Sequence, residues 1–317
     1  MGEIYDFDTV ILGGGPAGLS AGIYMARSNA KTAILDISML GGQPSNYLEL
    51  ENYPGFPIVG GYDLMEKFEE HADKFGVEKF PFQEIKSVNL LSNPKTIETN
   101  EGNIFKAKTV IIACGAQPKK LGVKGEEEFI GRGVSYCAVC DGAFYQDKTV
   151  AVVGGGNAAV EEGMYLTKFA KKVYLIHRRN ELRADKIVQE RAFQNDKMEF
   201  VWDSVVEEVQ GQDTVNNLVI KNVKTGEITD LGVDGVFPYI GFNPNITDIN
   251  GQVEQDQNGF IITDETMKTS IDGVYAVGDV RKTPLRQVIT AAADGAIGAV
   301  YAGKYLETLE ETEVAKV

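Results

Sequence analysis

The sequence TVILGGGPAG, residues 9–18, joins an apolar run to a glycine fingerprint, and VAVVGGGNAA repeats the pattern at residues 150–159. In each copy a predicted strand leads into a glycine turn and then into a helix, which is the setting in which such a fingerprint binds a dinucleotide. The sequence therefore predicts an α/β fold with two Rossmann-like dinucleotide-binding domains. The expected contacts are Gly13, Gly15, Pro16, Ala17 and Gly18 in the first site, and Gly154, Gly156, Asn157 and Ala158 in the second.

The residue that follows the second strand differs between the two copies. Asp36 follows the apolar run at residues 32–35 and stands eighteen positions after Gly18. An acid at this position can accept hydrogen bonds from ribose hydroxyls. His177 holds the equivalent position in the second copy. We therefore expect the two sites to bind different dinucleotides.

Basic residues gather around His177. Between Lys168 and Arg191 there are eight Lys or Arg and three Asp or Glu, which gives +5 within a chain of net charge −15. Such a run can be no more than a solvated helix face. Guanidinium groups at the end of a strand favour a 2′-phosphate, however, so the second site is predicted to prefer NADP(H). The expected contacts are His177, Arg178, Arg179 and Arg183.

A segment near the carboxyl end indicates which dinucleotide the first site binds. Residues 273–277 form a short apolar run that ends in Gly278-Asp279, and Arg286-Gln287 follow. The glycine permits close approach of the backbone, and the carboxylate can accept a hydrogen bond from a flavin ribityl hydroxyl. A strand that ends in Gly-Asp is also a common turn. Together with the two glycine fingerprints, the segment favours a flavin.

The motif Cys137-Ala138-Val139-Cys140 lies between the two fingerprints and predicts a redox-active dithiol. Half of a zinc site is the alternative, but four ligands are needed and the chain has one further cysteine and two histidines. We therefore expect no metal. Cys114 falls in an apolar run and is expected to be an inert buried thiol.

Composition excludes several classes of function. The charge of −15 argues against a nucleic-acid partner, which requires a basic face. The chain shows no secretory signal and no run of about 18 uninterrupted apolar residues, so we expect no membrane span. Three cysteines in 317 residues do not make a disulfide framework. These features favour a cytoplasmic protein.

Glycine and proline at residues 115–118 and 241–244 mark two crossings between domains. They predict a discontinuous first domain, residues 1–117 and 249–317, with a second domain inserted at residues 118–248. Two short connections of this kind would form a hinge.

These motifs together resemble the low-molecular-weight thioredoxin-disulfide reductases, and the resemblance covers essentially the full length. It includes Gly41-Gly42-Gln43 and Cys137 to Gly142 besides the segments described above. The resemblance implies a homodimeric flavoprotein whose first domain binds FAD, with Gly42 and Gln43 among the contacts, and whose inserted domain binds NADPH. It also implies that electrons pass to a thioredoxin disulfide, with rotation of the NADPH domain between the half-reactions.

The resemblance also assigns roles at the dithiol. It makes Cys140 the sulfur nearest the flavin, Cys137 the thiol that attacks thioredoxin, and Asp141 the acid-base residue. A carboxyl there could protonate a leaving thiolate if burial raises its pKa, although an aspartate before Gly142 could also be an ordinary turn residue.

Two alternatives to this function stay open at this point. A related flavoprotein could use another donor or acceptor, such as ferredoxin, oxygen or a thioredoxin-like partner. A non-catalytic redox sensor that responds to NADP(H) is the alternative outside enzymology. The arginine cluster and the dithiol favour electron transfer from NADPH to a disulfide.

Overall fold

The computed structural model describes residues 2–47, 50–246, 249 and 251–314. The chain divides into two compact units, Met1–Gln117 with Asn243–Val317, and Pro118–Phe242. The first division follows residue 117, where the sequence analysis also places it, and the second lies six residues before the predicted position of 248. Each unit is described below by itself.

The first unit is built on a sheet that has seven strands among the described residues, in the order β3-β2-β1-β6-β5-β4, with β16 also paired to β6. β1, β2, β3, β6 and β16 are parallel, whereas β4 and β5 form an antiparallel extension. All of β2 and the last four residues of β1 and β6 are buried, as expected for a parallel sheet covered on both faces. The strands are β1 (Ile4–Leu12), β2 (Thr32–Leu35), β3 (Glu78–Phe80), β4 (Ile85–Asn89), β5 (Lys95–Thr99), β6 (Ile104–Ile112) and β16 (Val274–Ala276).

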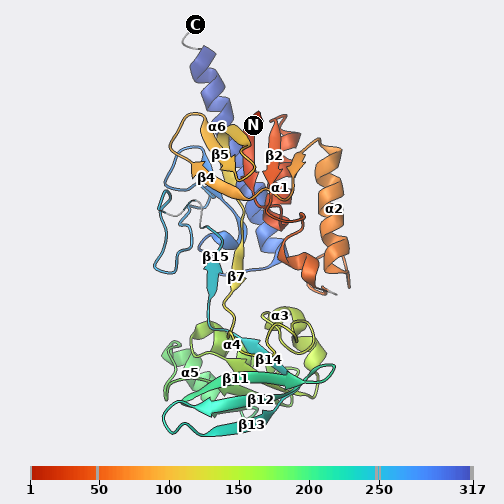
Figure 1. The fold of residues 1–317 in the computed structure, drawn as a ribbon, viewed down its shortest axis with the longest axis vertical. Coiled ribbons are helices and arrows are strands. Elements are labelled where there is room, and N and C mark those ends of the chain that lie inside the picture. Colours follow the sequence, from red (N-terminus) through yellow and green to blue (C-terminus); the bar gives the residue numbers. More distant parts are fainter. Residues whose placement is uncertain (1, 48–49, 247–248, 250, 315–317) are drawn as a thin grey trace. The chain divides into compact units, whose positions relative to one another are not determined.

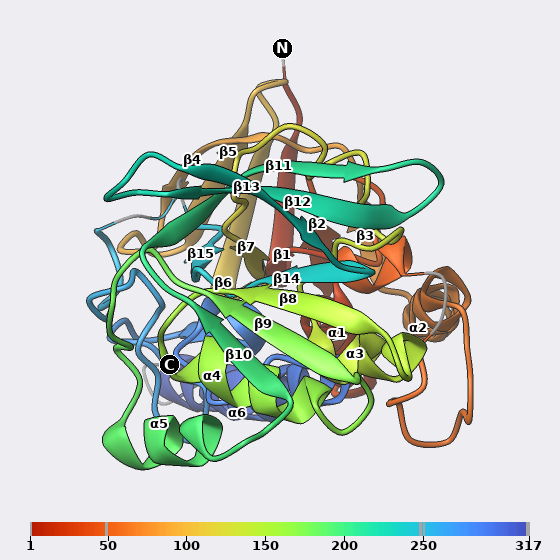
Figure 2. The same cartoon turned by 90° about the horizontal axis from the view of Figure 1, so that it is seen from below.

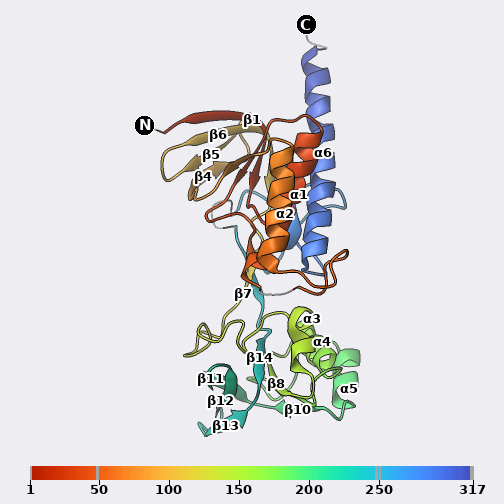
Figure 3. The same ribbon diagram turned by 90° about the vertical axis from the view of Figure 1, so that its right-hand side faces the viewer.

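Three helices cover one face of this sheet, α1 (Pro16–Arg27), α2 (Gly61–Lys74) and α6 (Val288–Val314) (Figure 3). α1 and α6 approach closely because α6 carries Gly295, where a Cβ atom would lie 2.1 Å from the carbonyl oxygen of Ala17. A core of apolar residues from α1, α6 and the sheet fills this side. A second core lies on the other face and includes Ile246, Ile249, Val253 and Ile261.

The second unit has a four-stranded parallel sheet in the order β10-β9-β8-β14 and a three-stranded antiparallel sheet, β11-β12-β13, among the described residues. Helices lie on one side of the parallel sheet and the antiparallel sheet on the other (Figures 2 and 3). The strands are β8 (Thr149–Val153), β9 (Lys172–Ile176), β10 (Met198–Val201), β11 (Ser204–Gly211), β12 (Val215–Asn222), β13 (Ile228–Gly232) and β14 (Gly235–Pro238), and the helices are α3 (Ala138–Asp141), α4 (Asn157–Leu166) and α5 (Lys186–Phe193).

Two short strands connect the units, β7 (Ala116–Pro118) and β15 (Phe242–Pro244), and they pair with each other (Figure 1). Beside this pair the N–H of Lys119 donates to the carbonyl of Gly241 at 2.8 Å. Short 3-10 turns are η1 (Gln43–Asn46), η2 (Gly142–Tyr145) and η4 (Gly278–Val280). None of the described helices is long and apolar enough to cross a membrane.

Candidate functional site

The first glycine loop lies against a second glycine turn in the first unit. Gly13 has φ +104° and Gly42 has φ +64°, a conformation that favours glycine. The N–H of Gly41 donates to the carbonyl of Gly14 at 2.8 Å, and a Cβ atom on Gly42 would lie 3.0 Å from the Cα of Gly15. The two loops therefore meet backbone to backbone, where side chains would fill the space.

Asp36 forms a hydrogen bond with the first glycine loop. Its carboxylate accepts hydrogen bonds from the N–H of Gly14 at 2.7 Å and from the N–H of Ser38 at 2.9 Å. The position at the end of β2 follows from the parallel pairing of β1 and β2. The ribose contact expected of Asp36 stays a prediction.

The segment after β16 joins the same loop. Gly278 has φ +72°, and a Cβ atom there would lie 2.9 Å from the Cβ of Ala17 at the start of α1. Burial raises the pKa of Asp279 to about 6, although the charge of Arg286 opposes this shift. The guanidinium of Arg286 lies 4.4 Å from the centre of the Phe260 ring.

Two other predicted residues of this site, Gln43 and Gln287, form hydrogen bonds within the first unit. The amide of Gln43 donates to the carbonyl of Ala116, and the amide of Asn52 donates to Gln287 at 3.0 Å. The start of α1, with Pro16 at its first turn, has no side-chain cap. The two glycine loops, the uncapped helix start and the half-buried carboxyl of Asp279 together fit the pyrophosphate and ribityl chain of a flavin dinucleotide.

The second glycine loop is tied to the basic segment that follows β9. The carbonyl of Gly155 accepts hydrogen bonds from the N–H groups of Arg183 at 2.6 Å and Ala184 at 3.2 Å. Asn157 and Asp185 exchange two further hydrogen bonds, at 2.7 and 2.8 Å. A Cβ atom on Gly156 would meet nothing within 4 Å, so the loop is open on that side.

The predicted phosphate-binding residues do not all face solvent. Arg178, Arg179 and Arg183 are exposed, and within the described ranges none of their guanidinium groups forms an ion pair. His177, in contrast, is buried at 4% exposure. The open loop and the three guanidinium groups fit a phosphorylated dinucleotide.

The two cysteines of the predicted dithiol form a disulfide, with Cα atoms 5.3 Å apart. Cys137 caps α3, and its Sγ accepts a hydrogen bond from the N–H of Cys140 at 3.1 Å. Both cysteines are half-buried. Cys114, which the sequence predicts to be buried, is instead half-buried, and its Sγ donates to the carbonyl of Leu12 at 3.3 Å. The structure therefore gives Cys114 no part in the dithiol.

Asp141 directly follows the dithiol. Burial raises the pKa of its carboxyl, and a hydrogen bond with Ser135 lowers it by a smaller amount. A carboxyl with a raised pKa holds its proton to higher pH and can deliver it to a leaving thiolate.

Residues 7–295 match the family described as pyridine nucleotide-disulphide oxidoreductase. The chain belongs to this family. Among curated relatives, thioredoxin reductase of Peptoclostridium litorale is 47% identical over 310 residues, which cover 96% of this chain and 98% of the relative. Thioredoxin reductase of Bacillus subtilis is 44% identical over 313 residues, 98% of each chain.

Solved structures of family members agree with this family assignment. The crystal structure of thioredoxin reductase from Streptococcus pyogenes is 50% identical, covers 96% of this chain and 99% of its own, and superposes with a TM-score of 0.89. The FR conformation of the Lactococcus lactis enzyme is 44% identical, covers 95% and 99%, and has a TM-score of 0.67. These findings confirm the resemblance and the Rossmann-like fold class that the sequence predicted, and they make the protein an oxidoreductase. Family membership implies a flavin and a pyridine nucleotide.

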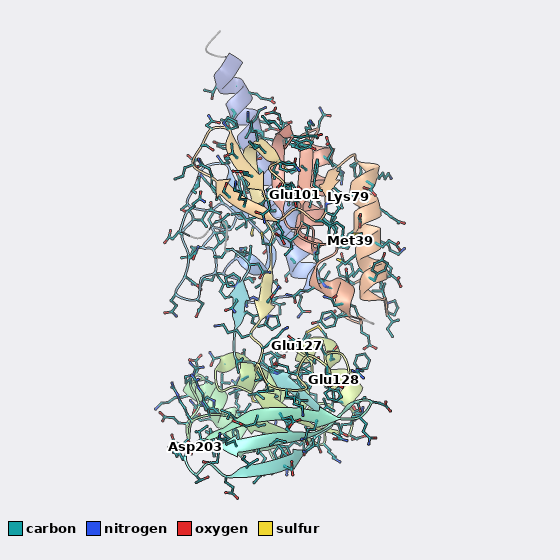
Figure 4. The ribbon with its side chains drawn as sticks, in the orientation of Figure 1. Met39, Lys79, Glu101, Glu127, Glu128 and Asp203 are labelled. Carbon is teal, nitrogen blue, oxygen red and sulfur yellow. A yellow bond between two sulfur atoms is a disulfide. The ribbon has the colours of Figure 1, made fainter. Side chains whose placement is uncertain are left out.

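The structure adds residues around the family's dithiol that the sequence analysis did not identify. Glu126 is buried at 1% exposure, and its carboxylate accepts hydrogen bonds from the Tyr136 hydroxyl at 2.8 Å and from two backbone N–H groups at 2.7 Å. Its neighbours Glu127 and Glu128 are exposed (Figure 4). Glu126 thus holds Tyr136, which precedes Cys137. The run of three glutamates has no pattern that marks the first as buried.

Two more residues hold this segment of the oxidoreductase. The hydroxyl of Ser135 accepts a hydrogen bond from the N–H of Cys137 at 3.1 Å. The hydroxyl of Tyr239 accepts one from the N–H of Ala138 at 2.6 Å. Ser135 stands two residues before the motif, so an ST-turn was a usable sequence signal, whereas Tyr239 follows β14 and gave none.

Proposed function

We propose that this protein is an NADPH-dependent thioredoxin-disulfide reductase that uses FAD and the Cys137–Cys140 disulfide. One observation carries the proposal: the unit with the disulfide also holds an open glycine loop and three exposed arginines, Arg178, Arg179 and Arg183. The two curated relatives reported above, both named thioredoxin reductase and 47% and 44% identical, support the choice of thioredoxin as acceptor.

Each dinucleotide is assigned by the chemistry of the residues around its loop. The cradle of Gly13, Gly15 and Gly42 with Asp279 suits FAD, because the carboxyl can bond a ribityl hydroxyl. Arg178, Arg179 and Arg183 suit the 2′-phosphate of NADPH, because guanidinium groups bind phosphate oxygens in a bidentate manner. When bound, FAD supplies the two-electron step that links the hydride of NADPH to the disulfide.

The thiols then carry out disulfide exchange. The Cys137 thiolate attacks one sulfur of the thioredoxin disulfide and forms a mixed disulfide, and the other thioredoxin sulfur leaves as a thiolate. The Cys140 thiolate then attacks the Sγ of Cys137, which restores the internal disulfide and releases dithiol thioredoxin. Asp141 holds the proton that neutralises a leaving thiolate, because burial raises its pKa.

We also propose that the two units rotate between the half-reactions about the paired strands β7 and β15. Two short connections leave few covalent restraints on such a rotation. The crystal structure of the Lactococcus lactis relative is of a state named the FR conformation. A homodimer, which the resemblance implies, and a cytoplasmic location, which the composition favours, are proposed with the function.

Rapid-mixing absorbance under anaerobic conditions tests the proposal. NADPH should bleach the flavin of the wild type and of Cys137→Ser, whereas oxidised thioredoxin should support turnover in the wild type alone. A flavin that NADPH does not bleach would overturn the donor assignment. The alternative would then be a donor like that of the Clostridium acetobutylicum neighbour, titled a ferredoxin-flavin thioredoxin reductase, 30% identical with a TM-score of 0.53.

A further inference from the structure

The imidazole of His177 lies beneath the second glycine loop. A Cβ atom on Gly155 would lie 2.3–2.6 Å from Cε1, Nδ1 and Nε2 of this ring. His177 is 4% exposed, and its backbone is held at the end of β9 by hydrogen bonds to Val201 at 2.9 Å and from Ser204 at 3.0 Å. The ring is therefore fixed in place and occupies the space next to the Cα of Gly155.

This placement gives a structural reason for a glycine at position 155, the middle glycine of the fingerprint, that does not depend on a bound dinucleotide. Gly155 must lack a side chain because the imidazole fills that side, whatever lies on the open face of the loop. The carbonyl of the same residue accepts the N–H of Arg183 at 2.6 Å. The ring thus supports the loop from below while the Gly155 carbonyl links the loop to an arginine of the basic cluster.

The imidazole is poorly placed to bind an anion. Its Nε2 is buried and has no hydrogen-bond partner among the residues that the structure describes. Burial lowers the pKa of His177, and the charges of Arg183, Arg179 and Arg178 lower it further, so the ring is neutral at pH 7. A hydrogen bond with the backbone of Glu181 acts in the opposite direction.

We infer that His177 is a positioning residue. Its ring supports Gly155 and so keeps the Gly155 carbonyl within hydrogen-bond distance of the Arg183 N–H. It is not a ligand of the 2′-phosphate. The inference rests on the proposed function, because it concerns how the second site binds NADPH. It separates two roles within the motif His177-Arg178-Arg179, which the sequence analysis treats as one phosphate-binding cluster.

Binding of NADP⁺ and NAD⁺ to the oxidised holoenzyme, measured by isothermal titration calorimetry, separates the two roles. His177→Ala should weaken both dinucleotides by the same factor, about 10-fold, because the loop loses its support. Arg183→Ala should weaken NADP⁺ by about 10-fold or more and NAD⁺ by far less, because one guanidinium–phosphate interaction is lost. A selective loss of NADP⁺ binding in His177→Ala would overturn the inference.

His177→Phe is the matched control, since it keeps a ring of similar size without the nitrogens. If the ring acts by filling space, both dinucleotides should bind within about 3-fold of wild type, a difference of about 0.7 kcal/mol at most. Loss of affinity as large as in His177→Ala would show that a ring nitrogen is required, and would overturn the inference.

A double substitution tests the contact itself. Gly155→Ala should impair dinucleotide binding, and adding His177→Ala should restore at least part of the affinity because the added Cβ then has room. Additive losses would overturn the contact. If Gly155→Ala does not fold, as judged by its thermal transition, the His177→Ala and His177→Phe pair decides the matter. A wild type that binds NAD⁺ as tightly as NADP⁺ would refute the proposed donor, while the double substitution still decides the role of His177.

Discussion

The hydroxyl of Tyr239 accepts a hydrogen bond from the N–H of Ala138 at 2.6 Å, which ties the residue after Cys137 to the end of β14. The N–H of Tyr239 donates to the carbonyl of Val153 at 2.8 Å, and its carbonyl oxygen lies 2.5 Å from where a Cβ atom on Gly154 would be. One residue therefore contacts both the start of α3 and the second glycine loop.

Tyr239→Phe should disturb the dithiol, because it leaves the Ala138 N–H without its acceptor. We expect a loss of about 1 kcal/mol of stability and slower reduction of thioredoxin by the pre-reduced enzyme in single-turnover experiments. Tyr62→Phe is the control, since the Tyr62 side chain is 64% exposed in the other unit. Equal rates for Tyr239→Phe and Tyr62→Phe would rule out a positioning role for the hydroxyl.

Glu126→Gln should destabilise the second unit by about 2–3 kcal/mol, because three hydrogen bonds to a buried carboxylate are weakened together. The single tryptophan, Trp202, lies in this unit, so its fluorescence during urea unfolding provides the measurement. Glu127→Gln should change the free energy by less than about 0.5 kcal/mol, since Glu127 is exposed and pairs with the exposed Lys120. Similar losses in the two variants would contradict the role of burial.

His177 should make the second unit less stable in mild acid. Burial lowers its pKa in the folded protein below the unfolded value of 6.5. The unfolded chain therefore takes up a proton first, and the free energy of unfolding falls as the pH drops below about 6.5. His177→Phe should flatten this dependence when urea unfolding is followed through Trp202 between about pH 8 and 5.5. Parallel curves for both proteins would refute the shift.

Asp141→Asn should slow thioredoxin reduction by about 100-fold, the usual contribution of general acid catalysis. In the wild type the raised pKa keeps the carboxyl protonated to higher pH, and turnover should fall as the pH rises through that pKa. Bleaching of the flavin by NADPH serves as the internal control. An Asp141→Asn variant that reduces thioredoxin at the wild-type rate at every pH tested would show that Asp141 does not supply the proton.

Gly278→Ala should reduce retention of flavin, because the new Cβ would lie 2.9 Å from Ala17 and push η4 away from the first glycine loop. Gly76→Ala is the matched control in the same unit. Gly76 has φ +77° against +72° for Gly278, but a Cβ atom there meets nothing within 4 Å. Flavin content after gel filtration, read from visible absorbance, should drop only in Gly278→Ala. Equal content in both variants would argue against the close approach.

The sequence predicted those parts of the site that depend on local pattern. The glycine loops after β1 and β8 form where a buried strand meets a helix start, and both lie within one short segment. The Cys137–Cys140 pair is close because two residues separate the cysteines. Such features need no knowledge of distant contacts.

Contacts between residues far apart in the chain could not be predicted from the sequence. Tyr239 and Ala138, which share a hydrogen bond, are 101 positions apart. Glu126, and neither of the two glutamates that follow it, is buried because the chain places its carboxylate beside the Tyr136 hydroxyl. His177 lies in a basic run that suggests a phosphate ligand, yet its ring packs against Gly155.

The two glycine loops, the dithiol and the α/β class therefore follow from the amino-acid sequence, because backbone conformation and strand-helix periodicity are local properties. The burial of His177, with Arg178 and Arg179 exposed to solvent, follows from the packing of the folded chain. Burial of a side chain depends on which strands and loops pack against it, and β9 places His177 between β10 and the second glycine loop.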